Sequence, residues 1–519
     1  MKKYILTVLM VLLTLPTFIS CDDMLESRSF GDLSENDFPK TEKDLKTLLA
    51  ALYTGFTSNW DAMHGWSTYS RMNGWWDASE SCSDEMWNNW FGEWRFGWTT
   101  AGFGHYDANF AKFRDITIAT NYIDLVAQAE MDDNFKKPVI AQMKCLRAWM
   151  MWCLYDWYGP LPVVLDAEKI YAPVEPRPTE TDYITWMVRD LEEAIPDLPD
   201  MTNDDKSKWG EVNKGVAYML LMKANMNWYK YTEAEGSNVL SLANANKYAD
   251  LLMGMGYQLQ TDYTSIFNVE RNHEVIWACT HDLSIEEGTG WYMFFMPGSI
   301  KNLTANGVTL PNGGWGGAVV RWEAYDRYPA GDKRLACLAN GFSGIDQGTG
   351  AAVSYTYSTE DRLAGKPAPH AYLTNGAIPT KYLYDLAVTG VDNFDLVVMR
   401  YADVLLSKAE IVYRTSGISA ALPYLKEVTD RAGITIPASA TASNAAFEQY
   451  LLDERSRELL LEGWRRQDMI RFDKFISWGK AQNYTAYSHM VRFPIPEEVI
   501  QAAGKNASGE NIIDQNEGY

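Results

Sequence analysis

The sequence has few basic residues and lacks the common motifs of catalytic sites. Its 519 residues include 46 Lys and Arg against 68 Asp and Glu, which gives a formal net charge of −22. A protein that binds along a nucleic-acid backbone needs a surplus of basic side chains to neutralise phosphates, so no nucleic-acid partner is expected. No GxSxG, Walker or GxGxxG motif occurs, and the sequence therefore gives no support for a serine hydrolase or a nucleotide-binding protein.

Histidine and cysteine are also scarce. The six histidines form no HExxH or HxH pattern, and the six cysteines form no CxxC pair. We therefore expect no transition-metal site and no cofactor. Cys145 and Cys153 lie in an apolar helical stretch and are interpreted as small core residues. Calcium binding at acidic clusters such as Asp204 and Asp205 is left open, with a solvated turn as the preferred interpretation.

Long apolar runs are absent beyond the N-terminus. Residues 1–20 contain two lysines and then a short apolar run, Ile5–Leu15, which is typical of a secretory signal peptide. Ser20 followed by Cys21 matches a lipoprotein signal, in which the cysteine carries the lipid; ordinary cleavage with a free cysteine is the alternative. Residues 21–40 are polar and without periodicity, and we predict that they form a lipidated tether.

Apolar residues recur at helical spacing over much of the remaining chain. They predict helices over residues 41–56, 111–130, 136–158, 179–195, 211–231, 243–254, 397–414, 419–432, 445–463 and 467–478. Inside one of these helices, steps of three and four predict a buried stripe made of Val139, Met143, Leu146, Met150, Cys153 and Trp157. The expected fold class is mainly α, with tetratricopeptide-like helix pairs.

Two parts of the chain break this helical pattern. Residues 59–104 are predicted to form a long loop region, and residues 255–400 are rich in Gly, Asn, Thr and aromatic residues, with strand-like pieces such as Glu274–Thr280. We therefore divide the chain into an N-terminal helical region, a loop-rich variable region with short strands and a C-terminal helical region, with 21–519 as one compact unit. The three regions are 41–255, 256–396 and 397–519.

Aromatic residues are abundant, with 20 Trp, 30 Tyr and 19 Phe. Eight of the tryptophans lie within 39 residues, in a segment that also carries Asn and Asp: Trp60, Trp66, Trp75, Trp76, Trp87, Trp90, Trp94 and Trp98. An indole stacks on the C–H face of a pyranose ring, while amides and carboxylates bond its hydroxyl groups. The composition favours a carbohydrate site on exposed tryptophans; the alternative is that most of these rings pack the segment onto the helices.

A second aromatic region, 287–322, places tryptophan and tyrosine among glycines. From the two regions we select eight candidate ligand-binding residues on composition alone: Trp75, Trp76, Asp84, Trp87, Asn88, Trp291, Tyr292 and Trp315.

Carboxylates and arginines alternate near the C-terminus, in Arg455, Glu458, Glu462, Arg465 and Asp468. A glycosidase needs two carboxyl groups that face each other across a cleft. Interleaved arginines instead hold carboxylates ionised. We interpret this segment as a structural ion network, and no catalytic residue is assigned.

Six segments occur in an order that is typical of one family: 37–56, 144–164, 398–414 (VMRYADVLLSKAEIVYR), 452–472 (LDERSRELLLEGWRRQDMIRF), 493–500 (FPIPEEVI) and 515–519 (QNEGY). Behind a lipoprotein signal, they resemble the SusD/RagB family of outer-membrane lipoproteins of glycan-degrading Gram-negative bacteria. Glu517 stands where proline is usual in that family.

The resemblance implies four tetratricopeptide-like helix pairs that carry a variable, loop-rich remainder. It also implies a surface-exposed lipoprotein of the outer membrane, not an enzyme, which binds an oligosaccharide and delivers it to a SusC-like TonB-dependent transporter. There are three alternatives: a glycoside hydrolase, a SusD-like protein that binds a peptide or another non-glycan nutrient, and a helical-repeat adaptor that binds the transporter but no small ligand.

Overall fold

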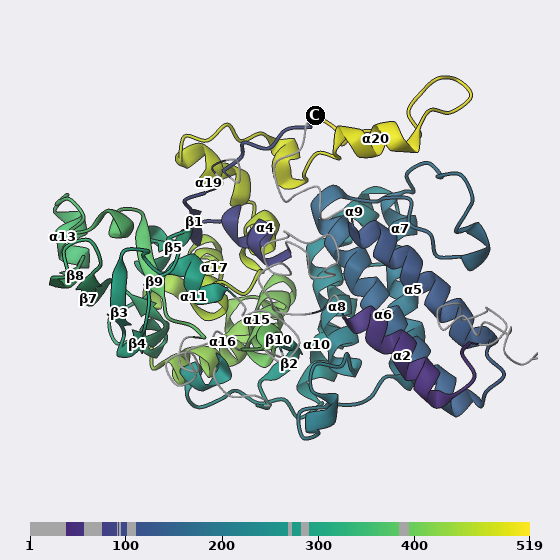
Figure 1. The fold of residues 1–519 in the computed structure, drawn as a ribbon, viewed down its shortest axis with the longest axis horizontal. Helices are drawn as coiled ribbons and strands as arrows, with labels where there is room; N and C mark the ends of the chain where they lie inside the picture. The colour runs from purple at the N-terminus through teal and green to yellow at the C-terminus, as the bar shows by residue number, and fades with distance from the viewer. Residues whose placement is uncertain are drawn as a thin grey trace, which may run out of the picture.

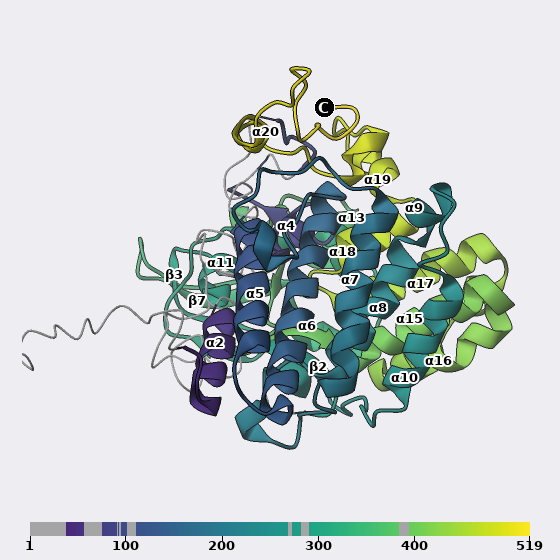
Figure 2. The same cartoon turned by 90° about the vertical axis from the view of Figure 1, so that its right-hand side faces the viewer.

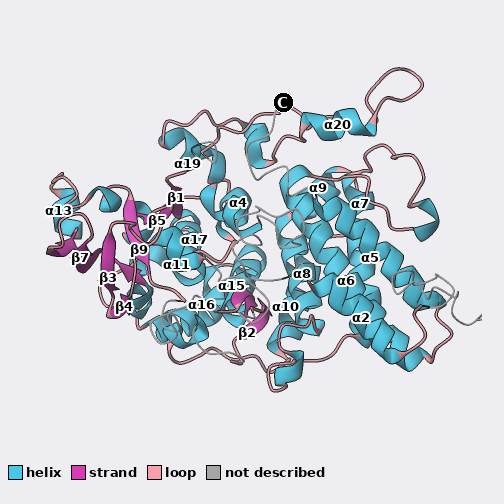
Figure 3. Ribbon diagram, viewed as in Figure 1, coloured by secondary structure: helices cyan, strands magenta, loops and turns pink. Residues whose placement is uncertain are grey.

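A computed structural model describes the fold over residues 38–54, 56, 75–90, 92, 95–100, 111–267, 272–281, 290–382 and 394–519. Helices fill the right and centre of the molecule, and most of the strands gather at the left (Figures 1 and 3). The predicted fold class, mainly α with a strand-containing, loop-rich region, is confirmed. The predicted signal peptide and Cys21 lie outside the described residues.

The longer helices are α2 (Glu42–Tyr53), α5 (Ala111–Gln128), α6 (Asp133–Tyr158), α7 (Glu180–Ala194), α8 (Lys214–Asn227), α10 (Leu242–Met253), α15 (Tyr401–Ser416), α16 (Ile418–Ala432) and α17 (Asn444–Leu459). The shorter helices are α4 (Trp75–Ser81), α9 (Tyr229–Ala234), α11 (Trp291–Phe295), α12 (Trp322–Tyr325), α13 (Thr359–Leu363), α18 (Arg465–Arg471), α19 (Phe475–Ala481) and α20 (Glu497–Ala503).

Helices that follow one another in the chain pack as neighbours. Helix α5 packs on α6, α6 on α7, α8 on α10, and α15 on α16. Helix α10 also contacts α15, so the C-terminal helices continue the array that the N-terminal helices begin (Figure 2). This is the arrangement in pairs that the sequence periodicity predicts.

Helix α6 shows how the sequence fixes one element. The Asp132 side chain accepts a hydrogen bond from the Asn134 amide and caps the first turn. The predicted stripe from Val139 to Trp157 is buried, and from Cys145 onward the helix is buried on every side. The helix ends at Gly159, whose φ of 75° suits glycine and whose missing side chain makes room for Arg492.

The strands are β1 (Met86–Asn88), β2 (Val275–Cys279), β3 (Ile300–Ala305), β4 (Val308–Leu310), β5 (Ala318–Arg321), β6 (Leu338–Ala339), β7 (Gly341–Asp346), β8 (Ala352–Thr356), β9 (Gly376–Pro379) and β10 (Leu396–Arg400). They form antiparallel sheets in the orders β1-β5-β9-β6, β10-β2 and β4-β3-β7-β8. Two of these sheets join strands from different predicted regions.

Four predictions about elements need correction. The helix expected over 211–231 divides at Trp228 into α8 and α9, and the helix expected over 467–478 divides near Asp473, whose φ is 56°. The helix expected from residue 397 begins at Tyr401, because residues 396–400 pair with β2 as a strand. Inside the predicted loop region 59–104, the structure contains α4 and β1.

Candidate functional site

Two of the selected tryptophans, Trp75 and Trp76, are buried, so the expectation that they are exposed is wrong. The Trp75 ring lies 5.2 Å from that of Trp149 and 5.4 Å from that of Trp464, centroid to centroid. The Trp76 indole N–H donates to the backbone oxygen of Leu461 over 2.8 Å. Both rings fasten α4 to helices distant in the sequence, and neither can receive a ligand.

Trp291 is likewise buried and not a ligand platform. Its ring lies 5.0 Å from Trp76 and 5.1 Å from Tyr382, so it joins the core between α4 and α11. The side chain of Tyr292 lies outside the described part of the structure, as do Trp60, Trp66 and Trp94.

The two selected polar residues have structural roles. Asp84 is buried and pairs with Arg465 over 2.6 Å and with Arg327. Burial raises the pKa of the Asp84 carboxyl, but the two guanidinium groups outweigh this effect and hold that pKa well below its usual range. Asn88 is also buried, and its side-chain oxygen accepts from the Trp90 amide over 2.9 Å. Neither side chain is placed to meet a ligand directly.

Trp87 is half-buried, with two arginines against its ring. The Arg95 and Arg321 guanidinium carbons lie 4.3 Å and 4.9 Å from the ring centroid. Cation–π contacts of this length hold charged groups on the indole. Its direct contact with a ligand stays a prediction.

An exposed aromatic pair is formed by Trp90 and Trp315. Their side chains are 39% and 47% exposed, with ring centroids 6.2 Å apart and planes inclined at 37°. Phe294 supports Trp90 from below, at 5.3 Å between centroids and 69° between planes. We call these two residues the Trp90–Trp315 pair. Trp315 is one of the eight candidate ligand-binding residues named from the sequence. Trp90 lies in the tryptophan-rich segment 60–98 but is not one of those eight.

Sheet register explains why these two tryptophans meet. Strand β1 pairs antiparallel with β5, with Asn88 opposite Ala318. The residues that follow β1 therefore lie beside those that precede β5. Asn89 completes the junction, because its amide donates to Gly317 over 2.7 Å and its side chain donates to Gly316 over 2.9 Å.

Glycines let the segment before β5 fold closely under Trp315. A Cβ on Gly313 would lie 2.3 Å from the Pro297 backbone oxygen, and one on Gly317 would lie 2.5 Å from the Phe294 ring. The backbone amides of Trp315, Gly316 and Gly317 donate to carbonyl groups of residues 293–296, at the end of α11. This close packing leaves the Trp315 ring directed outward from a fixed backbone.

The Trp90–Trp315 pair offers an apolar, gently angled surface to the solvent. A ligand that is a chain of flat, weakly polar rings can place the C–H face of one ring on each of these inclined indoles. The pair carries no acid or base, and stacking on it involves no bond breaking.

Asp77, on α4, is a buried carboxylic acid without a cationic partner in the described residues. Its Oδ1 accepts from the Ser81 hydroxyl over 2.5 Å. Burial raises the pKa of Asp77 to about 7, and its polar contacts with Ser81 and Asn88 offset this only in part. Asp77 therefore holds a proton in the folded protein at pH values where an unfolded chain has released it.

We expect Asp77→Asn to flatten the dependence of stability on pH. The unfolded aspartate releases its proton near pH 4, so the wild type loses stability as pH rises from about 4 to 7 while the variant does not. The unfolding free energy of the variant relative to wild type should rise by about 2–3 kcal/mol between pH 5 and 7. Urea unfolding followed by circular dichroism at several pH values measures this. Asp430→Asn, on the exposed face of α16, is the control; parallel curves for wild type and Asp77→Asn contradict the prediction.

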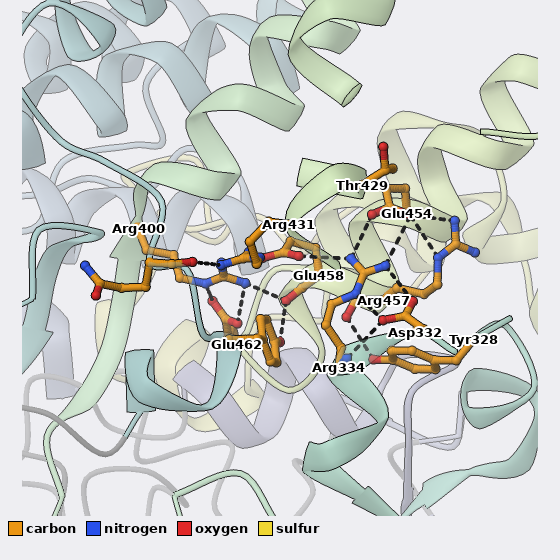
Figure 4. A network of polar contacts seen from close by, with 12 residues as sticks. Tyr328, Asp332, Arg334, Arg400, Thr429, Arg431, Glu454, Arg457, Glu458 and Glu462 are labelled. Atoms are coloured by element: carbon orange, nitrogen blue, oxygen red, sulfur yellow. Dashed lines mark hydrogen bonds and ion pairs between the residues drawn. The ribbon is translucent and has the colours of Figure 1, made fainter. Parts of the chain in front are cut away.

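The predicted ion network is confirmed as a buried structural feature. Glu458 contacts Arg400, Arg431 and Arg334, with Nη1–Oε distances of 2.6 Å from Arg400 and 2.9 Å from Arg334 (Figure 4). Glu462 accepts from Arg400 and Lys381. Glu454, Asp332 and Glu274 belong to the same network through Arg334 and Arg400. The other predicted residues form separate buried ion pairs, Arg455 with Asp403 and Asp468, and Arg465 with Asp84.

Two surface cavities lie elsewhere. One of about 800 Å³ is lined by α5, α6, α7 and residues 162–176, and one of about 860 Å³ by α2, α6 and residues 207–211. Neither is lined by the Trp90–Trp315 pair or by any selected residue.

Within the described ranges, no helix has both the length and the apolarity for a membrane span, and no three His, Cys, Asp or Glu side chains are grouped to hold a metal ion. The five described cysteines, Cys145 and Cys153 included, are free and buried, which confirms that those two are core residues.

Comparison with known proteins relates the chain to the SusD family. Residues 273–519 match the model of the SusD family, and four of the six motif segments fall inside that range. Starch-binding protein SusD of Bacteroides thetaiotaomicron is 24% identical over 73% of this chain and 72% of its own. SusD-like protein P38 of Formosa agariphila is 22% identical over 92% of this chain and 93% of its own.

Solved structures share the fold. Surface glycan-binding protein A from Bacteroides thetaiotaomicron, in complex with laminarihexaose, superposes with a TM-score of 0.68 at 22% identity, covering 91% of this chain and 99% of its own. A laminarin binding SusD-like protein superposes with a TM-score of 0.70 at 20% identity, covering 92% of this chain and all of its own.

Proposed function

Because the chain belongs to the SusD/RagB family, we propose that it captures an oligosaccharide on the Trp90–Trp315 pair. The observation that carries this proposal is the exposure of two neighbouring indoles on a backbone fixed by β1, β5 and α11. The chain is a binding protein and not an enzyme, in keeping with its family.

The ligand class we propose is a neutral glucan. Two of the relatives described above are named for binding starch or laminarin, both of which are uncharged glucose polymers. A net charge of −22 repels uronic or sulfated chains more than neutral ones. Affinity should be modest, because two partly exposed rings bury little area in the complex.

We further propose that the protein works at the cell surface, anchored through Cys21, and delivers its ligand to a SusC-like TonB-dependent transporter. The lipoprotein-type signal at residues 1–21 supports the anchor. The family supports the transporter as the partner.

Affinity electrophoresis of the chain from residue 22 onward, through gels that contain single polysaccharides, tests the binding function. We expect retardation by at least one neutral glucan, such as laminarin or starch, and none by polygalacturonate. Absence of retardation by every glycan contradicts the proposal and favours a peptide or other nutrient ligand. Release of reducing ends during incubation would instead favour the glycoside hydrolase alternative.

A further inference from the structure

A chain of three hydrogen bonds runs from the core to the backbone of Trp90. The Trp90 amide donates to Asn88 Oδ1 over 2.9 Å, Asn88 Nδ2 donates to Ser81 Oγ over 3.2 Å, and Ser81 Oγ donates to Asp77 Oδ1 over 2.5 Å. Asp77, Ser81 and Asn88 are each buried, while the Trp90 side chain at the other end is exposed.

The donors in this chain all point toward Asp77. Because the single Ser81 hydroxyl proton is directed to Asp77, the Ser81 oxygen is available to accept from the Asn88 amide group. That contact orients the Asn88 side chain with its NH₂ toward Ser81 and its oxygen toward the Trp90 amide. If the acceptor at Asp77 is removed, the Ser81 hydroxyl loses its fixed orientation, and the Asn88 amide loses the fixed position of one of its acceptors.

The turn that Asn88 holds is the one that supports the exposed pair. Asn89, within this turn, bonds to Gly316 and Gly317 on the segment that carries Trp315. The position of the Trp90 ring relative to Trp315 therefore depends on the geometry of residues 88–90.

We propose that Asp77 and Ser81 are positioning residues for ligand binding: through Asn88 they fix the turn that places Trp90 beside Trp315. This proposal rests on the proposed function, since it assigns to buried groups a role in the same site. Neither residue touches the ligand. A platform ring that is fixed before binding loses less conformational freedom when the sugar arrives.

The test compares Ser81→Ala and Asp77→Ala with a conservative variant of the same position, Asp77→Asn, which should restore binding, and with a control variant elsewhere, Ser407→Ala. Asp77→Asn keeps an oxygen that accepts from Ser81. Ser407→Ala removes a buried serine that donates to Asp403 over 3.1 Å, the same i,i+4 pairing on α15. Affinity is measured by isothermal titration with laminarihexaose and maltohexaose, and amide hydrogen exchange is measured in the peptide that contains residues 86–90.

We expect Ser81→Ala and Asp77→Ala to weaken affinity about 3- to 10-fold and to speed exchange of the Trp90 amide. Asp77→Asn and Ser407→Ala should change neither quantity by more than about twofold, although Ser407→Ala lowers the melting temperature. If Ser81→Ala has the affinity and the Trp90 amide exchange of the wild type, the proposal is overturned. It is also overturned if Ser407→Ala loses as much affinity as Ser81→Ala, because the loss would then come from lower stability in general. If the wild type binds no glycan, the proposed function fails, and unchanged Trp90 exchange in Ser81→Ala still overturns the positioning role.

Discussion

Replacing Arg400 by methionine is expected to lower the free energy of unfolding by about 3–5 kcal/mol. The Arg400 guanidinium is fully buried and donates to Glu274, Glu458 and Glu462. Removing this cation leaves three carboxylates in the interior whose negative charge is only partly balanced by the remaining cations. Uncompensated buried charge is one of the few causes of losses this large.

The neighbouring groups show why the arginine is required. Burial opposes ionisation of Glu458, yet the guanidinium groups of Arg431, Arg400 and Arg334 hold its pKa well below the usual range. Glu458 therefore remains charged in the folded protein and depends on all three arginines (Figure 4). Its contribution to stability is present above the unfolded pKa and is lost as pH falls through the folded value.

Denaturation in guanidinium chloride at pH 7 measures the Arg400→Met effect. Lys426→Ala is the matched control, because Lys426 forms an ion pair with Asp430 on the exposed surface of α16. Exposed pairs contribute about 0–1 kcal/mol, so the control should unfold near the wild-type midpoint. Similar losses in the two variants contradict the assignment of Arg400 to a buried ion network that stabilises the fold.

The second large effect concerns ligand binding. Trp90→Ala and Trp315→Ala are each expected to weaken binding of a retained glucan about 10-fold or more, because each removes one of the two stacking faces. Both side chains are substantially exposed, so stability should change by less than about 1 kcal/mol. Isothermal titration with the oligosaccharide measures the affinity, and thermal unfolding checks the fold.

Tyr487→Ala is the matched control for these variants. Tyr487 is 56% exposed, stacks on His489 and belongs to neither β1 nor β5. If Tyr487→Ala keeps the wild-type affinity while Trp90→Ala and Trp315→Ala lose it, the ligand binds at the Trp90–Trp315 pair. Equal affinity in all three variants contradicts this site.

The helical part of the fold could be predicted from the sequence because its signal is local. The apolar stripe from Val139 to Trp157 specifies a buried helix face within 19 residues. The breaks at Trp228 and Asp473 could not be predicted, since helix-forming residues continue on both sides of each. Strand β10 depends on pairing with β2, about 120 residues earlier in the chain.

The candidate site could be predicted only in part, because exposure of a tryptophan depends on distant residues. Trp75 and Trp76 are buried by Trp149, Trp464 and Leu461, which nothing near them in the sequence indicates. Trp315 is selected from the sequence because glycines surround it, and in the structure these glycines let its segment pack closely. The position of Trp90 beside Trp315 follows from the register of β1 with β5, which joins segments about 230 residues apart.

The most direct test of the central claim is a crystal structure of the protein with a neutral gluco-oligosaccharide, such as laminarihexaose, at saturating concentration. The account predicts glucose rings within van der Waals distance of the Trp90 and Trp315 indoles, with the backbone of residues 88–90 and 313–317 unchanged. Sugar bound in another part of the molecule, with both indoles open to solvent, would contradict it.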